Sequence, residues 1–336
     1  MAATPANLAV AVTGLLLGTA IGVLPGLGGT NGVALLLPLT FALSPTSAII
    51  LLASVYWGAI FGGAITAILF NIPGEPWSVA TTFDGHPLAR QGKAGIALTA
   101  AFTSSFIGAL VSIILFTFFA PPLAEFALKF GPPENFAVLL LAFATFAGLG
   151  GGNPVKTLVM TLLGLLLATV GFDSVSGQPR MNFGLVSLQS GIDFVVVAIG
   201  LFGLSEVFQS VYAGMHRSGP HSRPLLPKGA EFWPTRDDLR ECALPILRGT
   251  LLGFVVGVLP GAGATIASLM SYALEKTLSR SPERFGTGYM PGLAAPEAAN
   301  NAATAGAMVP LLALGIPGSA STAILLAGFL MWGLRP

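Results

Sequence analysis

Two stretches decide the fold: Gly14-Leu-Leu-Leu-Gly-Thr-Ala-Ile-Gly-Val-Leu-Pro-Gly-Leu-Gly-Gly-Thr30 and Gly249-Thr-Leu-Leu-Gly-Phe-Val-Val-Gly-Val-Leu-Pro-Gly-Ala-Gly-Ala-Thr265. They align without a gap at a constant offset of 235 residues, and 11 of the 17 positions are identical. A second shared element follows in each half, Asn71-Ile-Pro-Gly74 and Gly315-Ile-Pro-Gly318, at an offset of 244. Internal repeats are typical of secondary transporters. The sequence therefore predicts two related halves.

Each repeated stretch contains a place where a helix must break. Glycines at a spacing of four share one helix face, so Gly14, Gly18 and Gly22 are predicted to pack closely against a neighbouring helix. The Pro-Gly-x-Gly that follows removes a backbone donor and frees the chain from helical angles. At membrane depth such a break must be satisfied by protein or water, and it therefore usually lines a cavity. The alternative is an ordinary interfacial turn.

A helix that restarts near Thr30 would point free N–H groups and the positive end of its dipole into that cavity. Thr30 and Thr265 stand where N-cap hydroxyls are expected. The natural ligand of such an end is an anion, for example a substrate carboxylate.

Composition places the chain in lipid. Of its 336 residues, 54% are hydrophobic and 9% are charged, whereas soluble domains carry about 25% charged residues. The net charge of +1 implies no nucleic-acid partner. One cysteine excludes a disulfide framework, and the three histidines fall in polar stretches, so no haem, zinc or other cofactor is expected.

The lengths of the apolar segments predict how the chain crosses the bilayer. A spanning helix needs about 20 apolar residues; Ala48–Ile72 and Ala94–Ala120 are long enough, whereas Val33–Leu43 and Ala264–Leu274 are not. The polar stretch Gly214–Arg248 holds 6 of the 15 basic residues, which predicts a cytoplasmic loop. We expect an all-α polytopic membrane protein with two internal repeats, broken or re-entrant helices, and inverted topology. Its parts are the first repeat and connecting helices (1–213), the polar loop (214–248) and the start of the second repeat (249–336).

A polar sequence enters an otherwise apolar helix at Pro296-Glu-Ala-Ala-Asn-Asn-Ala-Ala-Thr304. Helical spacing places Glu297, Asn300, Asn301 and Thr304 largely on one face. Oxygen ligands of this kind suit substrate hydrogen bonding or Na⁺ near Asn300 and Asn301. A polar clamp between helices is the alternative.

The predicted substrate- and ion-binding residues come from the two repeated elements and this polar helix, with no metal site assigned firmly. They are Pro25, Gly26, Gly28, Thr30, Asn31, Asn71, Pro73, Gly74, Glu75, Ser78, Pro260, Gly261, Gly263, Thr265, Glu297, Asn300, Asn301, Thr304, Pro317, Gly318, Ser319, Ser321 and Thr322.

These motifs resemble the large membrane subunit of the tripartite tricarboxylate transporters. The matching stretches span nearly the whole chain and are Gly22–Phe41, Asn71–Gly85, Arg90–Gly95, Pro296–Asn301 and Leu314–Ser319. Gly29 stands where many members have proline, and the chain is shorter than typical members.

The resemblance implies a permease in the bacterial cytoplasmic membrane, working with a small membrane subunit and a periplasmic substrate-binding protein. It also implies organic-acid substrates (tricarboxylates, dicarboxylates or aromatic acids) and coupling to a Na⁺ or H⁺ gradient. A membrane-embedded enzyme and an ion channel are the weaker alternatives: the sequence offers no nucleophile–base pair, and a repeat within one chain argues mildly against a symmetric pore.

Overall fold

The computed structural model describes residues 3–24, 27–127, 154–173, 176–192, 232–259 and 263–334, with residues 197 and 208 and a few positions between 129 and 140. The first half contains α1 (Pro5–Val23), α2 (Gly28–Leu36), η1 (Pro38–Ala42), α3 (Pro45–Phe70), η2 (Pro76–Ser78), α4 (Val79–Leu88), η3 (Ala89–Lys93) and α5 (Ala94–Ala127). The second half contains α10 (Arg236–Val258), α11 (Gly263–Leu278), η7 (Pro282–Arg284), α12 (Met290–Leu314) and α13 (Ala320–Met331).

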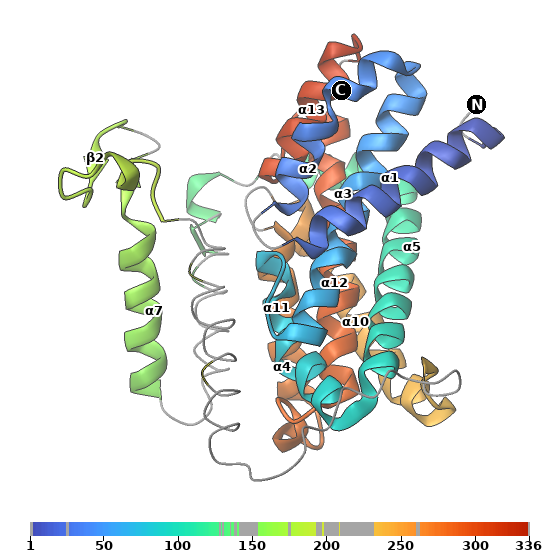
Figure 1. Ribbon diagram of the computed structural model, residues 1–336, viewed down its shortest axis with the longest axis vertical. Coiled ribbons are helices and arrows are strands. Elements are labelled where there is room, and N and C mark those ends of the chain that lie inside the picture. Colours follow the sequence, from blue (N-terminus) through green and yellow to red (C-terminus); the bar gives the residue numbers. More distant parts are fainter. Residues whose placement is uncertain are drawn as a thin grey trace.

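Between the halves lie α7 (Pro154–Ala168), η4 (Val186–Leu188) and a small hairpin of β1 (Gly171–Phe172) and β2 (Pro179–Arg180). The hairpin pairs antiparallel, with Gly171 opposite Arg180. In Figure 1, α7 and the hairpin stand beside the main helical body. The described chain is thus helical apart from two very short strands, as predicted.

Local sequence explains where the helices start. Ser44 caps α3 by accepting the N–H of Ser47, with Pro45 in the first turn. Thr235 and Asp238 form a reciprocal capping box that begins α10 at Arg236. The helix therefore starts inside the stretch assigned from sequence to the polar loop, most of whose remaining residues lie outside the described part of the chain.

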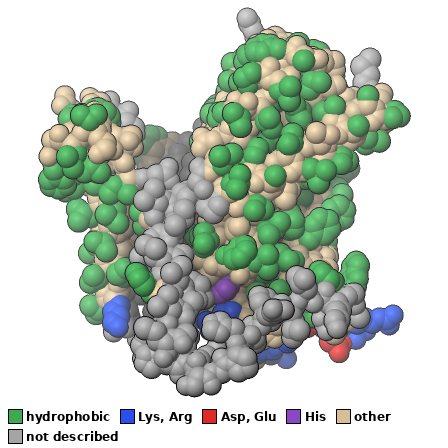
Figure 2. All heavy atoms as spheres, in the orientation of Figure 1, with side chains coloured by type: hydrophobic (Ala, Val, Ile, Leu, Met, Phe, Trp, Pro, Cys, Tyr) green, Lys and Arg blue, Asp and Glu red, His purple; other side chains and the backbone are tan. Residues whose placement is uncertain are grey.

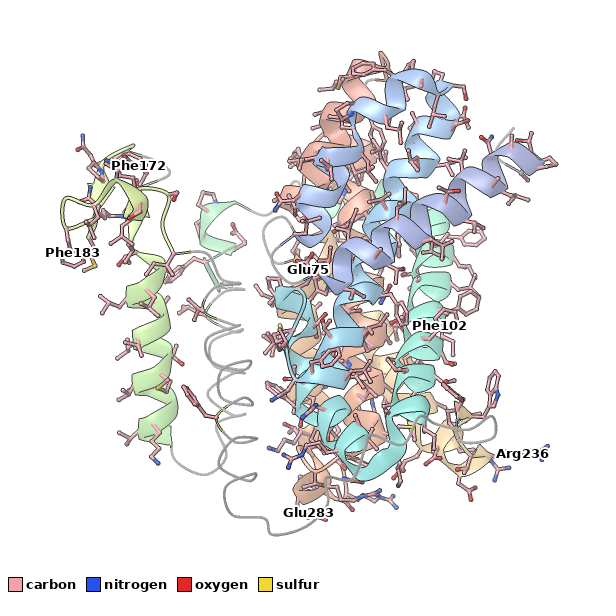
Figure 3. All side chains as sticks on the ribbon, viewed as in Figure 1. Glu75, Phe102, Phe172, Phe183, Arg236 and Glu283 are labelled. Atoms are coloured by element: carbon pink, nitrogen blue, oxygen red, sulfur yellow. The ribbon has the colours of Figure 1, made fainter. Side chains whose placement is uncertain are left out.

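Within the described residues, four helical stretches are long and apolar enough to cross a bilayer: Pro5–Val23, Pro45–Phe70, Pro76–Ala120 and Arg236–Val258. Figure 2 shows hydrophobic side chains over most of the visible face of the main body, with Lys and Arg gathered at its lower end. Figure 3 places Arg236 and Glu283 at that end and Glu75 at mid-height. This distribution is the one expected for a protein that spans a membrane.

Helix α12 lies at the centre of the main body, packed by α10, α5, α11 and α4 (Figure 1). Its small side chains make this possible, since Ala294, Ala295, Ala298, Ala299 and Ala302 are all fully buried. An apolar core that includes Leu52, Ile60, Leu311 and Leu325 joins α3 to α12 and α13. The core thus surrounds the helix that carries the predicted polar face.

Candidate functional site

Two glycine-faced helix pairs hold the breaks in place. A methyl group added at Gly18 or Gly22 of α1 would overlap the backbone of Val55 or Ala59 on α3. In the second half, Gly253 and Gly257 of α10 lie equally close to the backbone of Ala299 and Ala303 on α12. The close packing predicted for Gly18 and Gly22 is therefore present, and the glycines at the corresponding positions of α10 pack in the same way.

The helix breaks come directly after these glycine-rich helices in the sequence. Helix α1 ends at Val23 and α2 begins at Gly28, which has a φ of +67°, and α11 begins at Gly263 with a φ of +65°. Glycine accepts this left-handed region without steric cost. Pro25, Gly26, Pro260 and Gly261, which we predicted to form the breaks, lie outside the described residues.

The N-terminus of α2 already holds an anion, the chain's own Glu75. Its carboxylate accepts the backbone N–H of Gly29, and Glu75 is 6% exposed. A carboxylate is stabilised there by the free N–H groups and the helix dipole. The sequence predicted the chemistry of this end but assigned it to a substrate.

The expectation that Thr30 is an N-cap residue is wrong. Since α2 begins at Gly28 with Leu27 at the cap, Thr30 lies inside the first turn. Its hydroxyl instead lies 2.7 Å from the hydroxyl of Ser321. Thr265 likewise lies inside α11, and Asn31 is exposed on α2.

The second pair of breaks lies directly after α3 and α12. Asn71 ends α3 with a φ of +57° and Gly315 ends α12 with a φ of +67°, which is the left-handed capping conformation. Gly74 packs against Gly22 and Gly63, so the two breaks of the first half touch. Asn71 thus has a structural role.

The corresponding break of the second half lies directly before α13. Ser319 and Thr322 form its capping box, with Ser319 N–H donating to Thr322 Oγ1 at 2.8 Å. Gly318 is buried, whereas Pro317 is exposed. Thr322 is accordingly occupied by the cap.

The halves exchange contacts at these breaks. Thr30 on α2 meets Ser321 on α13, and Ser268 on α11 donates to the carbonyl of Trp77 on η2 at 2.8 Å. Tyr56 on α3, which is 2% exposed, directs its hydroxyl at Ser319, Thr304 and Ser321. Sequence reasoning missed Tyr56 because an aromatic residue within an apolar run carries no signal of a polar role.

The predicted face of α12 is buried as a unit. Glu297 and Asn300 are fully buried, and Asn301 and Thr304 are 3% and 1% exposed. The Glu297 carboxylate accepts hydrogen bonds from the hydroxyls of Thr81 and Ser105. Asn301 donates to Asn300 Oδ1 at 2.7 Å. The helix thus holds an acid and two amides in its packed interior.

Two buried polar atoms near these residues lack a hydrogen-bond partner in the described chain: Ser78 Oγ and Asn300 Nδ2. Buried donors normally have partners, so each unsatisfied one calls for an explanation. Ser78 lies beside Gly63, where an added methyl group would stand 2.7 Å from its hydroxyl.

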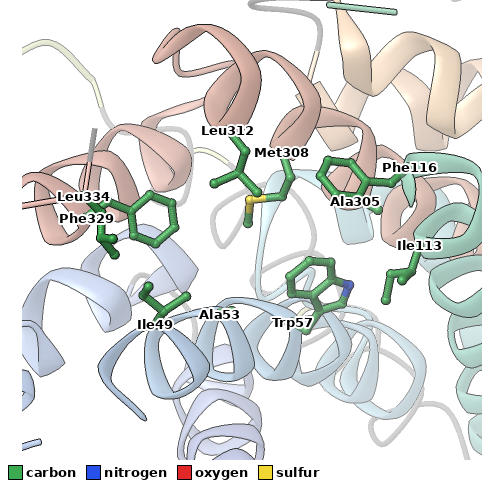
Figure 4. A pocket seen from close by; sticks show the side chains of 10 residues that line it. All are labelled: Ile49, Ala53, Trp57, Ile113, Phe116, Ala305, Met308, Leu312, Phe329 and Leu334. Carbon is green, nitrogen blue, oxygen red and sulfur yellow. The ribbon is translucent and has the colours of Figure 1, made fainter. Parts of the chain in front are cut away.

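An apolar cavity of about 430 Å³ lies between α3, α5, α12 and α13 (Figure 4). Trp57, Phe116, Met308 and Phe329 contribute to its wall. None of the predicted binding residues lines it. Its lining suits a hydrocarbon chain rather than a carboxylate.

Comparison with known proteins gives the family. The tripartite tricarboxylate transporter TctA family matches residues 8–336. The "Uncharacterized 52.8 kDa protein in TAR-I ttuC' 3'region" of Agrobacterium vitis is 44% identical over 335 residues, covering 100% of this chain and 66% of that protein.

A second relative, the "Uncharacterized protein in TAR-II ttuC' 3'region" of the same organism, is 46% identical over 84 residues, covering 25% of this chain and 35% of that protein. The chain thus spans just under two thirds of the length of the first relative. No solved structure matches. The resemblance seen in the sequence is confirmed: this chain belongs to the tripartite tricarboxylate transporter TctA family.

Proposed function

We propose that this chain is the substrate-translocating part of a binding-protein-dependent secondary transporter that imports tricarboxylates or related organic acids. The family supplies the class, a membrane subunit of a tripartite system. The observation that carries the proposal is the meeting of helix breaks from both halves, joined by Thr30 to Ser321 and by Ser268 to Trp77. Broken helices that meet between repeats are where transporters of this architecture bind their substrates.

The crossed contacts support two inverted repeats. Helix α2 packs on α13 of the other half, and α11 packs on η2 and α4. In each half, the short helix after the first break (α2 or α11) thus packs beside the second break of the other half. Such an exchange is what a pseudo-two-fold axis between the halves would produce.

The two halves differ at the residue that follows the Ile-Pro-Gly element, and this difference supports one position for the substrate. The offset of 244 aligns Glu75 with Ser319. In the first half, the Glu75 carboxylate accepts the N–H of Gly29 and neutralises the N-terminus of α2. In the second half, the matching residue is Ser319, which carries a hydroxyl instead of a charge. In this proposal a substrate carboxylate binds beside the hydroxyls of Ser319 and Tyr56.

In this proposal the substrate arrives from a periplasmic binding protein, a small membrane subunit accompanies the chain, and a Na⁺ or H⁺ gradient drives uptake. The end of the molecule that gathers Lys and Arg (Figure 2) would face the cytoplasm. Alternating access would move one half against the other around the breaks. A transporter family makes an enzymatic role the weaker alternative.

The test is uptake of labelled citrate and related acids into proteoliposomes that contain the full-length permease with its accompanying subunits and binding protein. Uptake should require an imposed Na⁺ or H⁺ gradient and no ATP. Uptake that needs ATP, or that ignores both gradients, would contradict the mechanism. Absence of any carboxylate uptake or exchange would contradict the substrate class.

A further inference from the structure

Glu297 is a fully buried carboxylate in the centre of the helical body. It belongs to α12, is 0% exposed, and is enclosed by α4 and α5. One carboxylate oxygen accepts the hydroxyl of Thr81 on α4, and the other accepts the hydroxyl of Ser105 on α5 at 2.9 Å. Gly108 brings α5 against the backbone of Ala298, so α5 cannot move away from α12 without opening this packing.

No cation of the described chain compensates this charge. Thr81, Ser105 and Asn300 are the side chains that act on the carboxyl group, and all three are uncharged. The ionisable residues on the elements packed against α12 are Tyr56 on α3, Glu75 before η2, Asp84 and His86 on α4, Glu125 on α5, Arg236, Asp237, Asp238, Arg240, Glu241, Cys242 and Arg248 on α10, and Tyr272, Glu275 and Lys276 on α11.

Several of these groups have partners of their own. Arg248 makes a two-point ion pair with Glu275 at 2.6 and 2.8 Å. Asp84 is bound by Tyr272 and by backbone N–H groups, and His86 Nδ1 lies 3.1 Å from the carbonyl of Ile68. An isolated buried carboxylate is strongly disfavoured, so the protein has to neutralise Glu297 by binding a small cation.

The geometry favours a proton over a metal ion. Hard cations require a shell of oxygen ligands. The hydroxyls of Thr81 and Ser105 already direct their hydrogens at the carboxylate. Asn301 donates to Asn300 Oδ1, so Asn300 acts on the Glu297 carboxyl group through its Nδ2 donor, and a donor repels a metal ion. A proton on one carboxyl oxygen needs none of these missing ligands.

We propose that Glu297 is the residue that takes up and releases the coupling proton, with Thr81 and Ser105 holding its carboxyl group in position. This inference rests on the proposed transport function. The carboxylate gains a proton from the aqueous space on one side, becomes the neutral acid, and returns the proton on the other side. Asn300 and Thr304 continue the same face of α12 towards Tyr56, which links the proton position to the break where the substrate would bind.

Replacing Glu297 by Gln supplies a permanent mimic of the neutral acid. The full-length transporter, reconstituted with its accompanying subunits, is assayed for exchange of labelled organic acid and for accumulation driven by a pH gradient. We expect the E297Q variant to retain at least half of the exchange rate and to lose accumulation at least 10-fold. E283Q is the matched control because Glu283 is exposed on η7, and it should retain both activities.

Each outcome has one meaning. Accumulation by E297Q in response to a pH gradient would overturn the proton assignment while leaving the transport function intact. Absence of exchange in the wild-type protein would instead refute the proposed function. Stabilisation by Na⁺ but not by choline, lost in E297Q, would also overturn the assignment and make the site a sodium site.

Infrared spectroscopy tests the proton without transport. The wild-type protein should show a carboxylic-acid C=O band that shifts in D₂O, weakens as the pH is raised, and is missing in E297Q. A carboxyl group that stays ionised, or stays protonated, across the whole accessible pH range would refute the inference.

Discussion

The hydroxyls of Thr30 and Ser321 lie 2.7 Å apart, although 291 residues separate them in the chain. This contact joins the first turn of α2 to the first turn of α13. A second polar contact, from Ser268 on α11 to the carbonyl of Trp77 on η2, reaches the break of the first half.

A double-mutant cycle on this contact should reveal coupling between the halves. T30V and S321A should each lower stability by about 1 kcal/mol, and the double variant should lose less than the sum, because the second change finds the hydrogen bond already broken. Thermal unfolding in detergent is measured for all four proteins. T103V is the control, since its hydroxyl bonds only back to Thr99 at 2.8 Å. Additive losses would mean that the pair does not interact.

The glycine faces should not tolerate a larger side chain. G18V should destabilise the protein by roughly 2 kcal/mol or more, because the added atoms overlap the backbone of Val55 rather than a side chain that can move. G164V is the control, as an added methyl group on α7 meets nothing within 4 Å. Labelling of the single cysteine, buried Cys242, by a thiol-reactive dye on heating reports unfolding. Equal melting temperatures for the two variants would contradict the packing.

Asp84 should prove to be a structural residue that fixes the connection between α11 and α12. Its Oδ1 accepts the backbone N–H groups of Gly286, Gly288 and Tyr289 at 2.7 to 2.9 Å, and Oδ2 accepts the Tyr272 hydroxyl at 3.0 Å. A buried donor left unsatisfied costs about 1–3 kcal/mol, and the hydrogen bonds from Tyr272 and from the Tyr289 N–H are buried. We therefore expect losses of stability in the order D84A, D84N, Y272F, measured by thermal unfolding. A larger loss for Y272F than for D84A would refute this arrangement.

Glu75 and Ser319 occupy matching positions but differ in charge, and this difference leads to a prediction. S319D should leave the fold intact, because aspartate is as good a cap for α13 as serine, but it should lower uptake of organic acids at least 10-fold by placing an anion where the substrate carboxylate would bind. S319N keeps the cap without the charge and should retain most of the uptake. Initial uptake rates of both variants are compared at matched expression. Equal rates would place the substrate elsewhere.

Local patterns could predict the backbone but not its long-range partners. The repeated Pro-Gly-x-Gly and Ile-Pro-Gly elements correctly indicated where helices end, since proline and glycine act on the chain next to them. The helical spacing of Glu297, Asn300 and Thr304 correctly predicted one buried face. These features depend on neighbours within one or two turns.

What the sequence could not show depends on contacts between distant residues. Asp84 lies in α4, and its carboxylate accepts backbone N–H groups near Tyr289, 205 residues further along the chain. Glu75 fills the α2 end through a contact that spans 46 residues. Tyr56 joins the polar cluster only because α3 packs beside the start of α13. No local sequence pattern predicts these long-range contacts.

The glycine-faced pairs also limit how the protein can move. Where backbone rests on backbone, no side chain can change rotamer to let one helix slide along the other. Helices α1 and α3 should therefore travel as one rigid block, and α10 and α12 as another. The hydroxyl contacts between α2 and α13 and between α11 and η2 are single hydrogen bonds that can break and re-form one at a time, so we expect the breaks to be the places where these blocks move relative to one another.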